Sequence, residues 1–200
     1  MYAKLSDANE RSFAAREDGF AHIDCMVADA SKTLALPIGC PTSFPKPLAR
    51  WCATPAPATA AGPDMWDKAV RWWRDAPGAL LEPWARAVVH SVETWKAFLK
   101  EVPGTRLLLD TGHVADWGGD VSELLEWADH IQLRQGCLGS TQLHAEDPRG
   151  TVDFDALFAR ADKIGYAGKF SIEYFDLAEI GWSLEHPRLW AIDLLATLRR

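Results

Sequence analysis

The sequence predicts an α/β fold built on a parallel β-sheet, and two observations support this. Short apolar runs alternate with longer amphipathic segments throughout the C-terminal half, which is the pattern of successive βα units. Four of these apolar runs end in, or near, a side chain that carries an oxygen donor. The alternation predicts the layered sheet, and the polar residues predict a functional site where the strands end.

Composition is that of a single-domain globular protein. With 200 residues, 48% hydrophobic and 24% charged, residues 1–200 can bury one core and are expected to form one domain. A formal net charge of −7 opposes attraction to phosphate backbones, so no nucleic-acid partner is expected. No apolar run approaches the roughly 18 residues that span a bilayer, so no membrane segment is expected. The four cysteines lack metal-binding spacing and the first residues lack an apolar signal core, so we expect a cytoplasmic protein.

The C-terminal half divides into alternating strands and helices. Strands are predicted at 79–82, 106–110, 130–133 and 169–174, and helices at 92–101, 121–127, 154–164 and 187–198. Asp120 and Asp153 stand at expected helix N-caps, Glu123 completes a capping box with Asp120, and Gly165 ends the helix that Asp153 opens. Residues 134–153 are expected to form a long loop, and loops of this length are often functional.

The N-terminal half gives weaker signals. A helix at 13–18 that Gly19 ends, strands at 22–27 and 32–36, and a short helix at 66–74 are predicted. Seven of the twelve prolines fall within residues 37–63, so this segment is expected to be mostly irregular. The first half therefore offers fewer βα units than the second.

Glu82, Asp110, Gln132 and Glu173 are the four polar residues at or near the ends of consecutive predicted strands. The apolar residues before each one anchor its side chain on a rigid element, as a metal ligand requires. Their oxygen donors are the ligand type that Mg²⁺ and Mn²⁺ prefer. His113, three residues beyond Asp110, is a candidate further ligand, or a residue that orients one.

Several short motifs carry a resemblance to a known family. The segments LDTGH at 109–113, GGD at 118–120, GTVDF at 150–154, GYAG at 165–168 and SIEY at 171–174 resemble the xylose-isomerase-like sugar isomerase/epimerase family. The resemblance implies a (β/α)8 TIM barrel, whose active site lies at the C-terminal ends of its strands. Because such barrels typically need about 250 residues, the barrel is expected to be shortened or incomplete in its N-terminal half.

The resemblance also implies a metal site. The family's metal-binding carboxylates match Glu82, Asp110 and Glu173, while Gln132 stands where most members have a histidine and resembles the glutamine of hydroxypyruvate isomerases. An oxygen-only ligand set favours Mg²⁺ or Mn²⁺ over Zn²⁺. The segment from Asp110 to His113 also resembles endonuclease IV, but the acidic net charge and Gln132 argue against that enzyme.

These residues predict a metal-dependent isomerase or epimerase that acts on a small sugar or hydroxy-keto acid. Proton transfer through an enediolate needs a base, a Lewis acid and an acid. Glu82 and Glu173 are the candidate acid/base pair, acting from opposite sides, while Asp110 and Gln132 hold the ion. Two alternatives stay open: a lyase or dehydratase of the same group, and a non-catalytic or accessory subunit of the same fold.

His113 and Arg134 are the candidate substrate-binding residues. Arg134 lies two residues beyond Gln132 on the same strand face and is placed to pair with a carboxylate or phosphate of the small-molecule substrate, or else forms a surface or loop salt bridge. A shortened barrel would expose strand edges and apolar surface, so a homo-oligomer or a partner subunit is expected to cover them.

Overall fold

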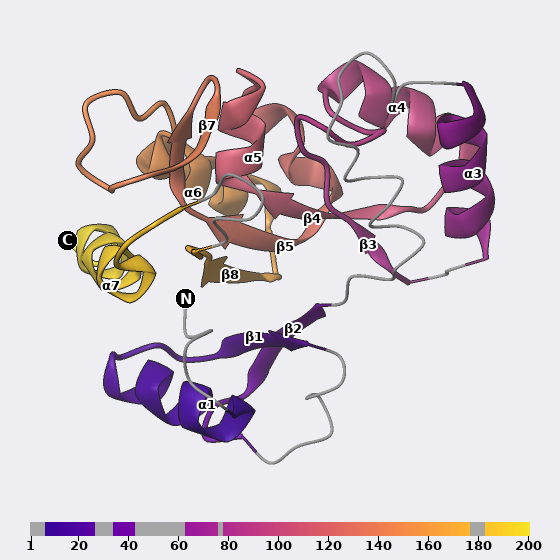
Figure 1. Cartoon of the computed structure of the whole chain (residues 1–200). Helices are drawn as coiled ribbons and strands as arrows, with labels where there is room; N and C mark the ends of the chain where they lie inside the picture. The colour runs from indigo at the N-terminus through magenta and orange to yellow at the C-terminus, as the bar shows by residue number, and fades with distance from the viewer. Residues whose placement is uncertain (1–6, 27–33, 43–62, 76–77, 177–182) are drawn as a thin grey trace.

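A four-stranded parallel sheet forms the centre of the structure (Figure 1), a computed structural model that describes residues 7–26, 34–42, 63–75, 78–176 and 183–200. Its strands, in spatial order, are β3 (Leu80–Leu81), β4 (Arg106–Asp110), β5 (Ala128–Leu133) and β8 (Lys169–Ile172). Asp110 lies opposite Gln132 in the β4–β5 register, and Gln132 lies opposite Ser171 in the β5–β8 register. Since the strands are parallel, the side chains at their C-terminal ends meet at one end of the sheet.

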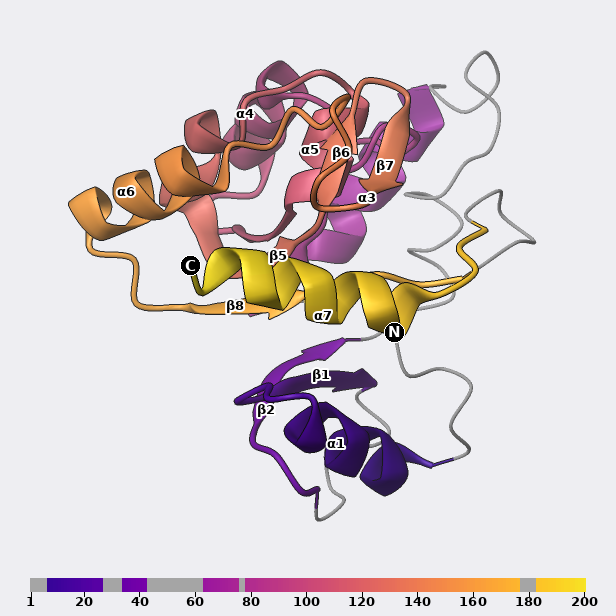
Figure 2. The same cartoon turned by 90° about the vertical axis from the view of Figure 1, so that its left-hand side faces the viewer.

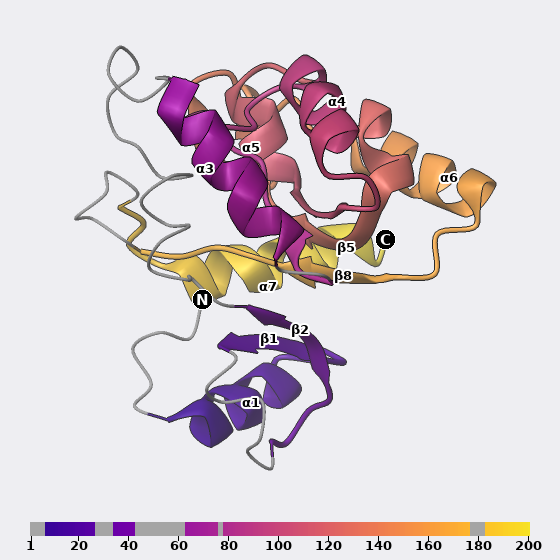
Figure 3. The same cartoon turned by 90° about the vertical axis from the view of Figure 1, so that its right-hand side faces the viewer.

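A second parallel sheet contains β1 (Ile23–Met26) and β2 (Ile38–Thr42). Figures 2 and 3 show this pair between the central sheet and helix α1 (Ala8–Glu17). We call α1, β1 and β2 the N-terminal unit. Within the described ranges the parallel strands thus form two separate sheets rather than one closed ring.

Among the described residues, α-helices cover the side of the central sheet away from the N-terminal unit, and one further helix lies beside β8 (Figures 1 and 3). They are α3 (Pro63–Arg74), α4 (Val92–Glu101), α5 (Thr111–Asp116), α6 (Phe154–Ile164) and, beside β8, α7 (Pro187–Leu198). Trp95 and Phe98 of α4 are fully buried in the same core cluster as Leu107, Leu109 and Ile131 of the sheet. Because side chains alternate along a strand, the face of β4 and β5 turned away from this core carries Asp110, His130 and Gln132.

The helices with strong local signals begin and end as predicted. Ser91 and Thr94 form a reciprocal capping box at the start of α4, and the side chain of Asp153 accepts a hydrogen bond from the Ala156 N–H at the start of α6. Gly165 ends α6 at φ 68°, a conformation that favours glycine. The predicted helices at 92–101, 154–164 and 187–198 and the strand at 106–110 are confirmed to the residue.

The N-terminal predictions need correction. Residues 34–36 of the predicted strand at 32–36 are not extended strand, while residues 38–42 of the predicted irregular segment form β2. Proline has no N–H to donate to a neighbouring strand. Pro41 is tolerated in β2 because, among the described strands, β2 pairs only with β1 and is therefore an edge strand. Helix α1 begins five residues earlier than predicted, because the Asp7 side chain caps it at the Asn9 N–H. Residues 27, 32–33 and 43–62 of these predictions lie outside the described residues.

Four C-terminal predictions also change. The predicted helix at 121–127 is two short 3₁₀ turns, Val121–Glu123 and Leu125–Trp127, although Asp120 does cap the first one at the Ser122 N–H. Helix α5 was not predicted. The predicted loop contains an antiparallel hairpin of β6 (Gln135–Cys137) and β7 (Ser140–Leu143). The predicted strands at 79–82 and 169–174 are shorter in the structure, so Glu82 and Glu173 lie just beyond β3 and β8.

None of the helices described here is long and apolar enough to cross a membrane.

Candidate metal centre and active site

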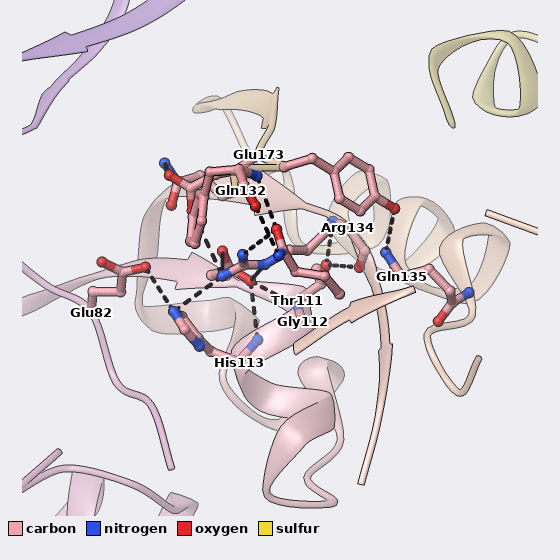
Figure 4. Close-up of polar contacts among 12 residues, drawn as sticks. Glu82, Thr111, Gly112, His113, Gln132, Arg134, Gln135 and Glu173 are labelled. Atoms are coloured by element: carbon pink, nitrogen blue, oxygen red, sulfur yellow. Dashed lines mark hydrogen bonds and ion pairs between the residues drawn. The ribbon is translucent and has the colours of Figure 1, made fainter. Parts of the chain in front are cut away.

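The four side chains predicted as a metal shell lie in one polar network at the C-terminal ends of the central strands (Figure 4). The Gln132 amide donates to Glu173, with 3.2 Å between Nε2 and Oε1. The guanidinium of Arg134 links Asp110 to Glu173, and the His113 ring lies 3.5 Å from Glu82 Oε1. The predicted convergence of Glu82, Asp110, Gln132 and Glu173 is therefore present in the geometry, and His113 and Arg134 lie between them.

Asp110 is fully buried and is the most constrained member of the network. Its Oδ1 accepts hydrogen bonds from the Gly112 and His113 N–H groups, at 2.8 and 3.0 Å, so the residue that ends β4 also caps α5. Burial alone would raise the pKa of Asp110, but Arg134, His113 and the hydrogen bonds outweigh burial and lower it. Asp110 is therefore held as an ionised carboxylate.

Arg134 is completely buried and approaches both carboxylate oxygens of Asp110, one through a hydrogen bond and the other through an ion-pair contact. Its Nε donates to Asp110 Oδ1 at 2.9 Å, and its terminal nitrogen lies 2.7 Å from Asp110 Oδ2. Gln142 of β7 accepts from the other terminal nitrogen at 3.3 Å, and the guanidinium lies 4.8 Å from the centre of the Phe175 ring. Hairpin β6–β7, which was not predicted from the sequence, thus helps hold the guanidinium of Arg134 in place.

Gly112 makes room for Arg134. A Cβ placed on Gly112 would lie 2.7 Å from both Cγ and Nε of Arg134 and would collide with the backbone oxygen of Thr141. Gly112 therefore allows α5 to lie close to Arg134 and to hairpin β6–β7.

His113 and Glu82 form the second half of the network. Burial and, secondarily, Arg134 lower the pKa of His113 to about 3, so its imidazole is neutral at physiological pH. Since an arginine only donates, the 3.1 Å contact from Arg134 makes His113 Nε2 the acceptor and leaves the ring proton on Nδ1. Burial and the nearby Asp110 raise the pKa of Glu82 to about 8, although 32% of its side chain is exposed. The ring of Trp84 lies 5.8 Å from the His113 ring and forms one wall of this region.

Gln132 and Glu173 occupy the other side. Burial is the main cause that raises the pKa of Glu173 well above its ordinary value, with Asp110 and Glu82 adding to it and Arg134 opposing. Gln132 is 3% exposed, and its Oε1 has no hydrogen-bond partner among the described residues. Glu173 is therefore a protonatable carboxyl group, and Gln132 presents a buried acceptor.

The residues fit a divalent cation in both charge and donor type. Three carboxyl groups, those of Glu82, Asp110 and Glu173, face the single guanidinium of Arg134, so full ionisation leaves two negative charges to be balanced. Ligand atoms of Glu82, Asp110 and His113 all lie within 4.8 Å of one another, and Gln132 Oε1 supplies a further donor without a described partner. His113, the candidate further ligand from the sequence, is therefore one of these closely spaced groups.

Two residues of the network escaped the sequence analysis. Asp24 of β1 and His130 of β5 form an ion pair, with 2.8 Å between Asp24 Oδ2 and His130 Nε2. His130 is two residues before Gln132 on one strand, and this spacing places both on the same face. No comparable signal marked Asp24, because its contacts depend on how the N-terminal unit lies against the central sheet.

Two surface cavities lie elsewhere. One of about 380 Å³ is lined by Arg106, Asp129 and Tyr166, and one of about 240 Å³ by Trp73, Arg106 and Asp129. Both lie where β4, β5 or β8 begins, the end of the sheet opposite to the carboxylate network, and that end of such barrels serves stability rather than catalysis.

Carboxylates gathered at the C-terminal ends of parallel strands are the arrangement found at the active-site face of TIM barrels. The chain belongs to the xylose isomerase-like TIM barrel family, whose model matches residues 50–200. The predicted fold class, an α/β barrel shortened in its N-terminal half, is confirmed. A comparison with curated proteins found no match.

Solved structures show the same fold. The structure of 3-keto-D-glucoside 4-epimerase YcjR from E. coli, in its apo form, matches with a TM-score of 0.66 over 100% of this chain and 96% of its own. The probable 3-DHS dehydratase AsbF from Bacillus anthracis gives 0.63 over 99% and 96%. An AP endonuclease, family 2, from Brucella melitensis gives 0.55 over 87% and 89%. All three are 16% identical to this chain and therefore establish similarity of fold only.

Proposed function

We propose that the protein is a divalent-metal-dependent isomerase or epimerase that acts on a small sugar or hydroxy-keto acid. The observation that carries this proposal is the placement of two carboxyl groups with raised pKa on opposite sides of the network. Glu82 follows β3 and Glu173 follows β8, the two outer strands of the central sheet, while Asp110 and Gln132 end the two strands between them. A substrate held over Asp110 and Gln132 is flanked by both glutamates.

Glu82 and Glu173 act as the acid/base pair. A carboxyl group whose pKa is close to the working pH exchanges protons with less cost than an ordinary glutamate, and Glu82 has a pKa of about 8. One glutamate, as the carboxylate, takes the proton from the carbon next to the carbonyl, and the other, as the carboxylic acid, donates its own proton to the enediolate from the opposite side. Exposure of 32% for Glu82 and 29% for Glu173 leaves both side chains open to a substrate.

Asp110, Gln132 and the two glutamates are the proposed ligands, with His113 as a further one. When bound, Mg²⁺ or Mn²⁺ supplies Lewis-acid polarisation of the substrate carbonyl. Arg134 keeps Asp110 ionised and fixed in direction, which is its role within the protein. Its contact with a substrate anion stays a prediction, as does the contact of His113 with substrate.

A second candidate function is that of an accessory subunit of the same fold. The observation that favours it is the guanidinium of Arg134, which already supplies a fixed positive charge among the carboxylates. A subunit of this kind would bind no metal and exchange no proton. A lyase or dehydratase reaction starts with the same proton removal and is separated from isomerisation by analysis of the products.

The test is incubation with Mg²⁺ or Mn²⁺ in D₂O, using hydroxypyruvate, tartronate semialdehyde and common ketoses. We expect deuterium to enter at the carbon next to the carbonyl, as followed by NMR. In Glu173→Gln the exchange should fall by about 10²–10⁴-fold, the usual contribution of a positioned acid or base. Glu146→Gln, which removes a glutamate that is 68% exposed, is the matched control and should exchange normally. Absence of both exchange and metal binding in the wild type would contradict the proposal.

A further inference from the structure

Asp24 reaches the candidate site from outside the family-matched region. It lies on β1, in the sheet that is separate from the central one, and its residue number precedes the matched range 50–200. Its side chain is only 14% exposed because it faces the polar side of β5. The N-terminal unit therefore supplies a carboxylate to the polar network, in addition to covering the sheet (Figure 1).

One oxygen of Asp24 accepts from two side chains of β5. Oδ2 lies 2.8 Å from His130 Nε2 and 3.4 Å from Gln132 Nε2. The same Gln132 nitrogen lies 3.2 Å from Glu173 Oε1, so both hydrogens of the amide point at carboxyl oxygens. The alternative orientation of the amide would place Oε1 against the Asp24 oxygen, where two acceptors repel each other.

Fixing the position of Gln132 Nε2 also fixes the direction in which Oε1 points. An amide binds a hard cation through its oxygen, and Gln132 Oε1 is buried without a hydrogen-bond partner among the described residues. Glu173 contacts the amide from one side only, whereas Asp24 Oδ2 is itself held by His130 Nε2 at 2.8 Å. Asp24 therefore constrains the orientation of the Gln132 amide.

We propose that Asp24 is a positioning residue that holds the Gln132 amide with Oε1 turned away from β1, as an oxygen ligand for the divalent cation. This inference rests on the proposed function, because it gives Asp24 a role toward the ion of that site. It also assigns the N-terminal unit a part in building the site, which the family-matched residues alone do not complete.

The first test is the affinity for Mn²⁺, measured by calorimetry and by EPR of the free ion. Asp24→Ala should raise the Kd by about 10–100-fold, the usual effect of losing a residue that orients a metal ligand. Asp24→Asn keeps an acceptor oxygen in the same place and should retain most of the affinity. Asp162→Ala removes an exposed aspartate on α6 and controls for the change in net charge. Equal losses in the Ala and Asn variants would overturn the inference.

A double-mutant cycle separates orientation from simple damage to the fold. In Gln132→Glu both ligand oxygens are equivalent, so no orienting partner is needed, and adding Asp24→Ala should cause no further loss of Mn²⁺ affinity. A loss of the same size in both backgrounds would mean that Asp24 acts through stability alone, and the inference would be wrong. If the wild type itself binds no Mn²⁺, the proposed function fails; if the wild type and Asp24→Ala bind equally, only the role of Asp24 fails.

Discussion

At the residue scale, the buried carboxyl groups differ in charge because their partners differ. Asp110 has two backbone donors and an arginine that approaches both of its carboxylate oxygens, and its pKa is lowered. Glu82 and Glu173 are less well paired, and burial raises their pKa values. Asp110 is thus held as a carboxylate, whereas Glu82 titrates at about pH 8 and the pKa of Glu173 is also raised by burial.

The pH dependence of stability follows from these shifts. Glu82 is protonated more readily in the folded state, with a pKa of about 8 against its ordinary 4.5, so the stability that this proton gives is complete below pH 4.5 and is lost as pH rises through 8. His113 has the opposite effect on stability. Its pKa is about 3 in the folded protein, against an ordinary 6.5, so the stability that the neutral ring gives is present above pH 6.5 and is lost as pH falls. Above pH 6.5 the contribution of His113 is constant, and the raised pKa values of Glu82 and Glu173 both make stability fall as pH rises.

We expect the melting temperature of the metal-free protein, held in EDTA, to fall as pH rises from 6.5 to 8. The fall should be shallower in Glu82→Gln, because glutamine does not titrate, and unchanged in Glu146→Gln. Thermal unfolding followed by circular dichroism at several pH values measures both slopes. An identical slope in wild type and Glu82→Gln would show that Glu82 does not carry a raised pKa.

At the element scale, local signals predicted those elements whose stability is local. Helices α4 and α6 carry their caps in adjacent residues, and both were predicted to the residue. Residues 121–127 carried a capping signal too, but Val121 and Leu124 are both buried, and the three-residue period of a 3₁₀ turn aligns them on one side. Packing against the core outweighed the local preference there.

Helix α5 was missed because Asp110 ends a strand and caps a helix at the same position. From the sequence, Asp110 was interpreted only as a strand end and a metal ligand, and the six-residue helix is too short to show periodicity. The Gly112 of this helix lies against the Arg134 side chain and the Thr141 backbone. That contact fixes the distance between α5 and hairpin β6–β7.

Substitution of Gly112 by alanine tests this contact, because helix propensity and packing predict opposite changes in the free energy of unfolding. Helix propensity alone would make Gly112→Ala stabilising by up to about 1 kcal/mol. The added methyl group instead meets buried atoms that are already closely packed, and overpacking of this kind costs about 1–3 kcal/mol. We therefore expect the free energy of unfolding, measured in urea, to fall. An increase in stability would mean that α5 and the hairpin move apart freely.

At the scale of the whole molecule, polar contacts join the N-terminal unit to the rest of the chain. Arg188 of α7 pairs with Asp18 through two 2.8 Å hydrogen bonds, and His22 lies 3.0 Å from Ser171 of β8. Together with the Asp24–His130 pair, these contacts place the N-terminal unit over the polar face of the central sheet. The site therefore depends on residues far apart in the sequence.

Metal binding should stabilise the molecule as a whole, because the proposed ligands come from the ends of all four central strands. At a Mn²⁺ concentration of 100 times the Kd, linkage predicts about 2.7 kcal/mol. For a chain of this size that corresponds to a rise in melting temperature of about 5–11 °C. EDTA should reverse the rise, Asp110→Asn should lack it, and Asp162→Asn should keep it. A wild-type melting temperature that Mn²⁺ leaves unchanged would contradict the site.

The sequence by itself determined the α/β class, the confirmed helices and the four strand-end residues. The reason is that periodicity, caps and strand ends are properties of neighbouring residues. Parallel strands bring their C-terminal ends together, so the convergence of Glu82, Asp110, Gln132 and Glu173 could be predicted from their places in the strands alone. Whether each of them binds metal stays a prediction.

The tertiary structure alone decided the rest. It buried Arg134 against Asp110 instead of leaving it at the surface, placed the Arg134 guanidinium 3.1 Å from His113 Nε2, and brought Asp24 from β1 to the Gln132 amide. These relations join residues that are 21 to 108 positions apart, and no local pattern encodes them. They arise because burial leaves each polar group only the partners that packing places beside it.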